Sequence, residues 1–314
     1  MKITSINVQE LRNNGWTLVD MGISSKKIKK YKLGVEKLRD KAFKVKYPLA
    51  RCYYPHLRNE NIAAIESPFN NLISNVELKE FFYNLNLGES IKKLMNWDNV
   101  YLHLSRLFTM KGYKYLGQWH RDFDFWDGDI KTMHTIQVGI YLKDQDGFRI
   151  IKPEYDLWGS SKERLKEEFK SNSYLPYNLP KHFYSEIKGK AGYAIFFAPG
   201  LLHQGNSNTE RLDFHFRFSN NIVIDHLQNS NYSFIKNKNF DFEIPNFYDE
   251  NFNIKNDIAS PRYYKSGLKL RLINSINYYT GIYNAFRYFK EKYFIKNLNP
   301  TLKLNLKSNT IFQE

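Results

Sequence analysis

The most regular pattern in this chain is an alternation of polar and apolar residues from Arg211 to Phe218. Successive side chains of an extended strand leave opposite faces of a sheet. One face is therefore polar and the other apolar: Arg211, Asp213, His215 and Arg217 against Leu212, Phe214, Phe216 and Phe218. A strand with these two faces is expected to pack its apolar side on a core and to line a site with its polar side.

Period-two patterns predict further strands along the chain. Over 99–109 the expected buried face carries Val100, Leu102 and Leu104. Over 132–143 one face is expected to be polar or small and the other aliphatic: Thr135, Gln137, Gly139 and Tyr141 against Ile136, Val138, Ile140 and Leu142. Apolar runs predict the remaining strands, at 16–21, 148–152 and 193–198, with Leu202 and His203 entering another.

Helical spacing and capping signals predict helices beside this sheet. The segments are 9–14, ended by Gly15; a helix from Ser24 with Ile28, Tyr31, Val35 and Leu38 on one face; a helix opened by the Ser74 capping box and ended by Gly88; and one beginning near Ser160. A turn is expected at 144–147 and a loop at 172–180. The fold class predicted is mostly β with flanking helices.

Composition places these elements in one large β-rich domain. The chain has 314 residues, of which 42% are apolar and 17% aromatic, enough for a sizeable core. A single cysteine, Cys52, excludes an internal disulfide. The polar start predicts no secretory signal, and no apolar run reaches the roughly 18 residues of a membrane span. We therefore expect a cytoplasmic protein.

The formal net charge of +15 favours an anionic partner, such as a phosphorylated metabolite, a lipid surface or nucleic acid. A Lys-rich and Asn-rich genome would give the same charge without any functional meaning. No base-reading motif or zinc finger accompanies the charge, so nucleic acid is the least favoured of the three partners.

A candidate metal site begins at His120 and Asp122, near the end of a strand signal. Positions i and i+2 of an extended segment share one face, so an imidazole and a carboxylate there can reach one cation. Among the eight histidines, only His120 has an acidic residue two positions later. His203 is the best third ligand. Two histidines and one carboxylate with open positions are typical of non-haem Fe(II) oxygenases.

The polar face of 211–218 adds two guanidiniums close in sequence to His203. A planar guanidinium can hold a carboxylate through two charge-assisted bonds, as a dicarboxylate cosubstrate requires. Arg211 is the preferred candidate for this contact. For Arg217 the simpler explanation, an exposed side chain or one in an ion pair, for example with Asp213, is favoured.

Three blocks of the chain, in this order and spacing, resemble the phytanoyl-CoA dioxygenase-like family of Fe(II)/2-oxoglutarate-dependent dioxygenases. They are Trp119-His120-Arg121-Asp122 with the strand up to Leu142, the segment 147–153, and the segment 189–218. The resemblance extends over about the first 225 residues. It implies a double-stranded β-helix, also called a jelly roll or cupin-like fold.

By this resemblance His120, Asp122 and His203 would bind iron, and Arg211 would bind the distal carboxylate of 2-oxoglutarate. Gln137 and Tyr141 fall where strands of the fold often contribute further cosubstrate contacts. Arg217, the second arginine of the polar face, is a further cosubstrate-binding candidate. One departure is at Pro153-Glu154-Tyr155-Asp156, where the family has a proline-glycine-serine-histidine turn beside the substrate entrance. The substrate therefore cannot be transferred from the family.

The function predicted is hydroxylation of a small, anionic molecule (a sugar, glycan precursor or lipid-linked metabolite) by Fe(II), 2-oxoglutarate and O2, with release of succinate and CO2. The alternative is a non-catalytic metal-binding barrel that acts as a sensor or interaction module, with Zn(II) as one metal that would suit the ligands. A nucleic-acid-repair oxygenase is a third hypothesis, motivated by charge alone.

The expected domain division is 1–225 for the oxygenase barrel with its bracing helices and 226–314 for a C-terminal extension. Within the extension, 261–296 has helical spacing of aromatic residues and many basic residues. Such a helix can lie peripherally on the inner, anionic face of a membrane. It can equally dock on its own barrel or on a partner subunit.

Overall fold

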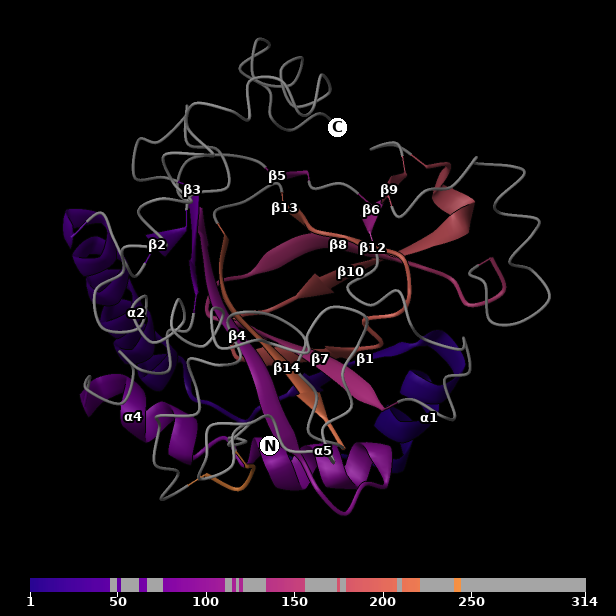
Figure 1. Cartoon of the computed structure of the whole chain (residues 1–314), viewed down its shortest axis with the longest axis horizontal. Helices are drawn as coiled ribbons and strands as arrows, with labels where there is room; N and C mark the ends of the chain where they lie inside the picture. The colour runs from indigo at the N-terminus through magenta and orange to yellow at the C-terminus, as the bar shows by residue number, and fades with distance from the viewer. Residues whose placement is uncertain are drawn as a thin grey trace, which may run out of the picture.

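The structure is a computed structural model that describes residues 1–45, 50–51, 62–66, 76–110, 115–116, 119–120, 134–155, 174–175, 179–207, 211–220 and 240–243 (Figure 1). Its helices are α1 Ser5–Asn14, α2 Ser25–Val45, α4 Val76–Tyr83, α5 Leu87–Met95 and the 3-10 helix η3 Lys181–Phe183. Its strands are β1 Trp16–Asp20, β2 Ala50–Arg51, β3 Ile62–Glu66, β4 Tyr101–Met110, β5 Tyr115–Leu116, β6 Trp119–His120, β7 Thr135–Tyr141, β8 Gln145–Ile151, β9 Tyr174–Leu175, β10 Tyr184–Gly189, β11 Tyr193–Phe197, β12 His203–Gln204, β13 Asn206–Ser207 and β14 Arg211–Ser219.

The strands form two main antiparallel sheets whose order defines the fold. The larger sheet has the order β1-β11-β7-β14-β4-β3-β2, and the smaller has β10-β8-β12-β6-β9. The chain passes repeatedly between the sheets: β4, β7, β11 and β14 lie in the larger, and β6, β8, β10 and β12 in the smaller. This is the strand order of a double-stranded β-helix, so the predicted jelly-roll barrel is confirmed.

Aromatic packing shows which face of the larger sheet is the outside. The ring of Phe82 on α4 lies 5.0 Å from that of Phe214 and 5.4 Å from that of Phe216, both on β14. The apolar face of β14 therefore packs under the helices, which cover this side of the larger sheet (Figure 1). The polar face must point the other way, toward the smaller sheet. Phe148 of β8 and Phe197 of β11 bridge the two sheets inside the barrel, with ring centroids 4.9 Å apart.

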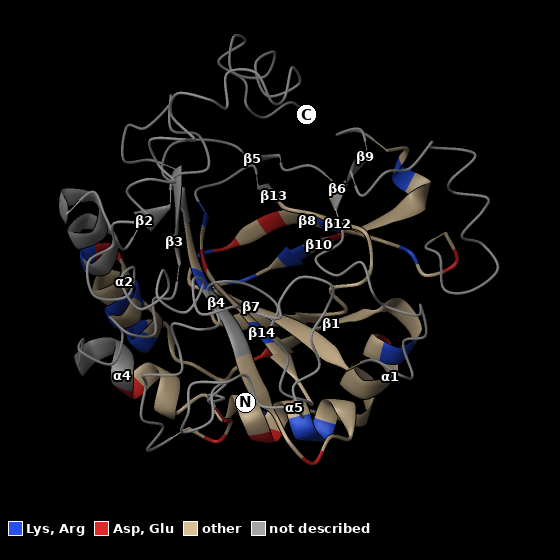
Figure 2. Cartoon of the chain, in the orientation of Figure 1, with Lys and Arg blue, Asp and Glu red and all other residues tan. Residues whose placement is uncertain are grey.

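The N-terminal elements follow the sequence prediction closely. Helix α1 begins at Ser5, earlier than expected, because Thr4 and Asn7 form a reciprocal capping box. It ends at Asn14, followed by the C-cap residue Gly15, which has a left-handed φ of 76°. Strand β1 and helix α2 follow as predicted, and α2 buries Ile28, Tyr31 and Val35. Figure 2 shows the basic residues on α2; the exposed ones include Lys26, Lys27, Lys29 and Lys30.

The prediction that Gly88 ends a helix is wrong. Helix α4 already ends at Tyr83, and Gly88 lies in the first turn of α5. The glycine is needed for close approach, because a Cβ at this position would overlap the carbonyl oxygen of Asp241. Asp241 also accepts a hydrogen bond from the backbone N–H of Glu89, 2.9 Å away, and so satisfies a donor of the first turn.

Strict alternation along β4 is also wrong, because the strand contains a bulge. Arg217 of β14 pairs with Leu104 and the next residue, Phe218, pairs with Leu102. The ladder therefore skips His103, and the alternation shifts by one residue. Leu102 and Leu107 are both buried although they are five positions apart, which an unbroken period of two does not allow.

Two smaller expectations need correction. The turn expected at 144–147 belongs largely to β8, which begins at Gln145 and contains a second bulge opposite Ile187 and Lys188. Gly147 accommodates that bulge with a φ of 100°. The loop expected at 172–180 includes the short strand β9, which pairs with β6.

Several predictions fall outside the described residues: Asp122, the helix near Ser160, and the C-terminal extension with its basic helix at 261–296. The exception is 240–243, which lies on the barrel. Phe242 packs against Phe218 with ring centroids 5.2 Å apart, and Glu243 exchanges backbone hydrogen bonds with Val100 and Leu102. Within the part of the chain that is described, no helix is long and apolar enough to cross a membrane.

Candidate metal and cosubstrate site

The two histidines predicted to bind iron occupy opposed positions on neighbouring strands. The ladder between β12 and β6 pairs His203 directly with His120, although the residues are 83 positions apart in sequence (203 minus 120). Opposed positions of an antiparallel pair belong to the same face of the sheet. The fold therefore places two expected ligands at one point of the smaller sheet.

The imidazole of His203 is buried and held in one orientation. Its Nδ1 lies 2.8 Å from the carbonyl oxygen of Leu201, and only 3% of the residue is exposed. A carbonyl can only accept, so Nδ1 carries the proton and the lone pair of the neutral ring is on Nε2. This is the usual way in which a second hydrogen bond prepares a histidine for metal binding. The rings of Phe197 and Phe148, with centroids 5.0 and 6.0 Å from that of His203, make its surroundings apolar.

The third expected ligand, Asp122, lies outside the described residues, two positions beyond the end of β6. No group of three or more His, Cys, Asp or Glu residues with metal-binding geometry occurs in the described ranges. The ligand set of His120, Asp122 and His203 thus stays a prediction, of which the structure supplies the His120–His203 pairing.

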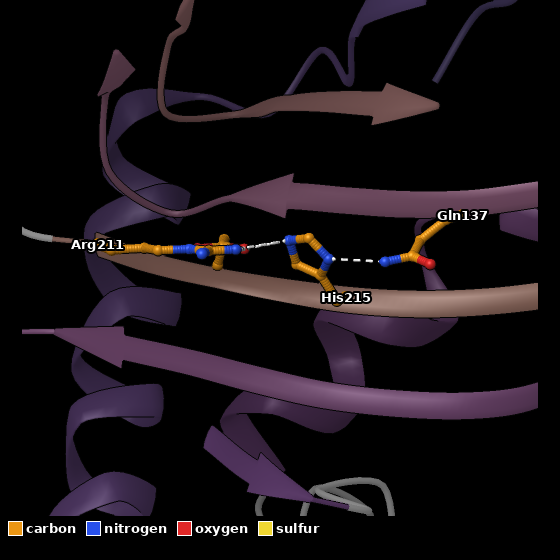
Figure 3. A network of polar contacts seen from close by, with 4 residues as sticks. Gln137, Arg211 and His215 are labelled. Carbon is orange, nitrogen blue, oxygen red and sulfur yellow. Dashed lines mark hydrogen bonds and ion pairs between the residues drawn. The ribbon is translucent and has the colours of Figure 1, made fainter. Parts of the chain in front are cut away.

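The polar face of β14 lines the barrel interior, as the alternation predicted. All four of its side chains are buried: Arg211, Asp213, His215 and Arg217 are 8%, 0%, 6% and 3% exposed. Gln137, Gly139 and Tyr141 of β7 stand opposite Arg217, His215 and Asp213 in the ladder. Figure 3 shows Arg211, His215 and Gln137 in one row along this wall.

Asp213 is the centre of this network. Arg211 donates to it through both Nε and Nη2, at 2.5 and 3.1 Å, and Nε2 of His215 lies 2.6 Å from its Oδ2. Burial alone raises the pKa of the carboxyl, but the guanidinium of Arg211 and the imidazole of His215, each through electrostatic attraction and a hydrogen bond, outweigh burial and lower the pKa to about 2. Asp213 is therefore a carboxylate at every pH at which the protein is expected to work.

We expect Asp213→Asn to lower the free energy of unfolding by about 3–5 kcal/mol at pH 7, because it leaves the buried Arg211 without its carboxylate. The native pKa of Asp213, about 2, lies below its ordinary 3.8. Its charge therefore stabilises the fold above pH 4, and this contribution is lost as the pH falls toward 2. Denaturant unfolding should be measured between pH 7 and 3. The difference in free energy of unfolding between the unmodified protein and Asp213→Asn should shrink as the pH falls. Asp98→Asn, at an exposed aspartate, is the control, and an equal deficit in both variants would contradict the prediction.

The expectation that Arg217 is exposed is wrong, and so is an ion pair between Arg217 and Asp213. Its side chain is buried, and its Nε and Nη2 donate to Oε1 of Gln137, each at 3.3 Å. The ion pair with Asp213 belongs instead to Arg211, the residue preferred as the cosubstrate ligand. Sequence spacing could not distinguish the two arginines as partners of Asp213. Arg211 lies two positions before Asp213 and Arg217 four positions after it, so both share its face of the strand.

Tyr141 presents a buried hydroxyl to this wall. The residue is 3% exposed, and within the described part of the structure its hydroxyl has no hydrogen-bond partner. Burial, and then the charge of Asp213, raise the pKa of the phenol, so it stays protonated and can donate. The ring packs on Gly189, where a Cβ would lie 2.2 Å from a ring carbon. An unsatisfied buried hydroxyl is costly, and a ligand that accepts its hydrogen bond would remove that cost.

Two residues of the site were not identified from sequence as functional. Asp213 and His215 were recognised only as members of a polar face. The signal was present in the alternation itself, because four consecutive inward positions are charged or polar. Nothing in the sequence showed that Asp213 would bind Arg211 and not Arg217.

Comparison with known proteins supports the fold at low sequence identity. No family model matches the chain, and no curated protein matches it. Among solved structures, EctD from S. alaskensis, solved with bound Fe, superposes with a TM-score of 0.52 and 17% identity over 69% of this chain and 76% of EctD. AviO1 from Streptomyces viridochromogenes Tue57 superposes with a TM-score of 0.50 and 12% identity over 68% of this chain and 94% of AviO1. The chain therefore shares the barrel fold of these proteins.

Proposed function

We propose that this protein is a non-haem Fe(II)/2-oxoglutarate-dependent oxygenase that hydroxylates a small anionic molecule. The observation that carries the proposal is the pairing of His120 with His203 in a barrel whose opposite wall bears Arg211 and the unsatisfied hydroxyl of Tyr141. On this proposal one wall would offer metal ligands, and the other would offer donors for a carboxylate. EctD, which shares the fold, was solved with bound Fe.

The orientation of His203 and the position of His120 in the ladder would suit an iron ion. His203 directs the unprotonated Nε2 away from its backbone partner, and His120 stands beside it in the ladder. Asp122, two residues after His120, would supply the carboxylate of a facial triad. The rings of Phe148 and Phe197 make the His203 side of the site apolar, which would help to keep water from a reactive centre.

The residues present also fit a dicarboxylate cosubstrate. Tyr141 and Asp213 are opposed in the ladder, Arg211 is two residues from Asp213 on the same face, and the charges of both residues act on the phenol of Tyr141. A carboxylate held by both would receive charge-assisted bonds in a site with little water. When bound, iron and 2-oxoglutarate would use O2 to hydroxylate an adjacent C–H bond, releasing succinate and CO2.

The test is anaerobic addition of Fe(II) and then 2-oxoglutarate to the full-length protein, followed by visible spectroscopy. The proposal expects a weak charge-transfer band only when both are present, and slow 2-oxoglutarate decarboxylation after oxygen is admitted. A non-catalytic metal-binding barrel would bind the metal without the band and without turnover. Tight binding of Zn(II) with no response to 2-oxoglutarate would likewise decide for that alternative.

For the substrate, we propose an anionic metabolite because the chain has a net charge of +15 and exposes several lysines on α2.

We also propose that the basic segment 261–296 makes a peripheral contact with an anionic membrane. Each basic residue near such a surface contributes about 1 kcal/mol. Co-sedimentation with anionic vesicles at low salt, lost in a chain ending near 257, would support this contact; no binding would favour a freely soluble substrate.

A further inference from the structure

A continuous chain of buried polar contacts runs along the wall that carries Arg211 (Figure 3). Arg217 contacts Oε1 of Gln137, whose Nε2 lies 3.2 Å from Nδ1 of His215. Nε2 of His215 lies 2.6 Å from Oδ2 of Asp213, which in turn binds Arg211. Five side chains from two strands are thus connected along β14 from Arg211 to Arg217.

Elementary donor and acceptor rules fix the direction of every bond in this chain. A guanidinium can only donate, so the atom of Gln137 that faces Arg217 must be its oxygen. The amide nitrogen of Gln137 therefore faces His215 and donates to Nδ1. Since Nδ1 must then accept, the proton of the neutral imidazole is on Nε2, where it is donated to the carboxylate of Asp213.

The tautomer of His215 matters because its Nε2 also lies 3.0 Å from Nη2 of Arg211. With the proton on Nε2, the imidazole cannot accept from Arg211, and the guanidinium is oriented by Asp213. In the opposite tautomer, Nε2 would accept from Arg211 and would direct its lone pair at Oδ2 of Asp213, 2.6 Å away. That arrangement would turn Arg211 toward His215 and weaken its bond to Asp213.

The packing around His215 leaves little room for another arrangement. Its ring meets that of Phe108 edge-on with centroids 4.8 Å apart, and Phe108 also lies 4.3 Å beneath the guanidinium of Arg211. On the other side, a Cβ at Gly139 would lie only 3.3 Å from Nε2 of His215. Rotation of the ring is therefore restricted, so the hydrogen bonds select the tautomer within a fixed position.

We infer that Arg217 and Gln137 are positioning residues: they fix His215 as its neutral tautomer protonated on Nε2, and through Asp213 they hold Arg211 in the orientation that receives the cosubstrate carboxylate. The role toward the cosubstrate rests on the proposed function, whereas the tautomer does not. Gln137 and Arg217 thus serve the site without touching 2-oxoglutarate.

The tautomer can be measured directly by 15N NMR of the histidine side chains in the full-length, metal-free protein, with His215→Asn to identify the signals. The expected spectrum has a protonated Nε2 and an unprotonated Nδ1. Arg217→Met should give a mixture of tautomers, because the side-chain amide of Gln137 can then flip and present its oxygen to His215. Arg217→Lys, which still only donates, should restore the single tautomer. Gln137→Glu presents an oxygen to His215 and should place a proton on Nδ1.

The second measurement is 2-oxoglutarate and Fe(II) affinity in the same variants. Arg217→Met should weaken the binding of 2-oxoglutarate roughly 3- to 10-fold, as expected for one misplaced hydrogen bond, and should leave the affinity for Fe(II) unchanged. Arg217→Lys should recover most of the loss. Weaker cosubstrate binding with unchanged His215 signals would overturn the inference, since Arg217 would then contact the cosubstrate itself.

A protonated Nδ1 in the unmodified protein would overturn the inference without any variant. A shifted tautomer with unchanged 2-oxoglutarate affinity would overturn the link to Arg211. If the unmodified protein bound no 2-oxoglutarate, the proposed function would fail, while the NMR spectrum would still decide whether Arg217 and Gln137 set the tautomer.

Discussion

Replacement of His203 by alanine is expected to abolish stoichiometric Fe(II) binding and all 2-oxoglutarate turnover. The side chain is oriented by Leu201 and its strand position is opposite that of His120, so its loss would remove one of the three proposed ligands. The same result is expected for His120→Ala and Asp122→Ala. Iron should be measured after anaerobic loading and desalting, beside the far-ultraviolet circular dichroism of each variant.

A matched control is His182→Ala, which removes an exposed histidine of η3 and should retain full iron stoichiometry. Iron retained at full stoichiometry in two of the three ligand variants would refute the metal site. Loss of iron in His203→Ala and His120→Ala but not in Asp122→Ala would mean that the carboxylate comes from a different residue, and that the His-x-Asp spacing is accidental.

The second large effect is expected at Arg211, the residue proposed to bind the cosubstrate carboxylate. Arg211→Ala should raise the 2-oxoglutarate concentration required for binding by about 10- to 150-fold while leaving iron bound, because a charge-assisted contact is worth about 1.5–3 kcal/mol. Titration of the Fe(II)-loaded, anaerobic protein with 2-oxoglutarate measures this directly. A larger effect of Arg217→Ala than of Arg211→Ala would show that the wrong arginine has been assigned.

Tyr141→Phe distinguishes an effect on 2-oxoglutarate affinity from an effect on the free energy of unfolding. The hydroxyl is buried and lacks a hydrogen-bond partner among the described residues, so its removal should leave the ligand-free protein as stable as before or more stable. The same change should weaken the binding of 2-oxoglutarate roughly 2- to 10-fold, since it removes one neutral hydrogen-bond donor. Destabilisation of the ligand-free protein would mean that the hydroxyl already has a partner.

Much of the barrel could be predicted because strand periodicity is a local property. The alternation in β14 and β7 depends only on the geometry of an extended chain and on which residues prefer water, and both faces are where it placed them. The failures are also physical. The bulge at His103 is a pairing event that no single-strand pattern records, and Gly88 is a glycine because Asp241, far away in sequence, passes close to it.

For the site, the sequence by itself determined which residue types are available: a His-x-Asp pair, a distant histidine, and a strand face with two arginines and one aspartate. Only the tertiary structure decided how they are combined. Strand order brings His203 opposite His120. Side-chain packing on the polar face of β14 pairs Arg211 with Asp213 and Arg217 with Gln137. Spacing constrains which face a residue occupies, but partner choice depends on distances and donor directions that exist only once the sheets have packed.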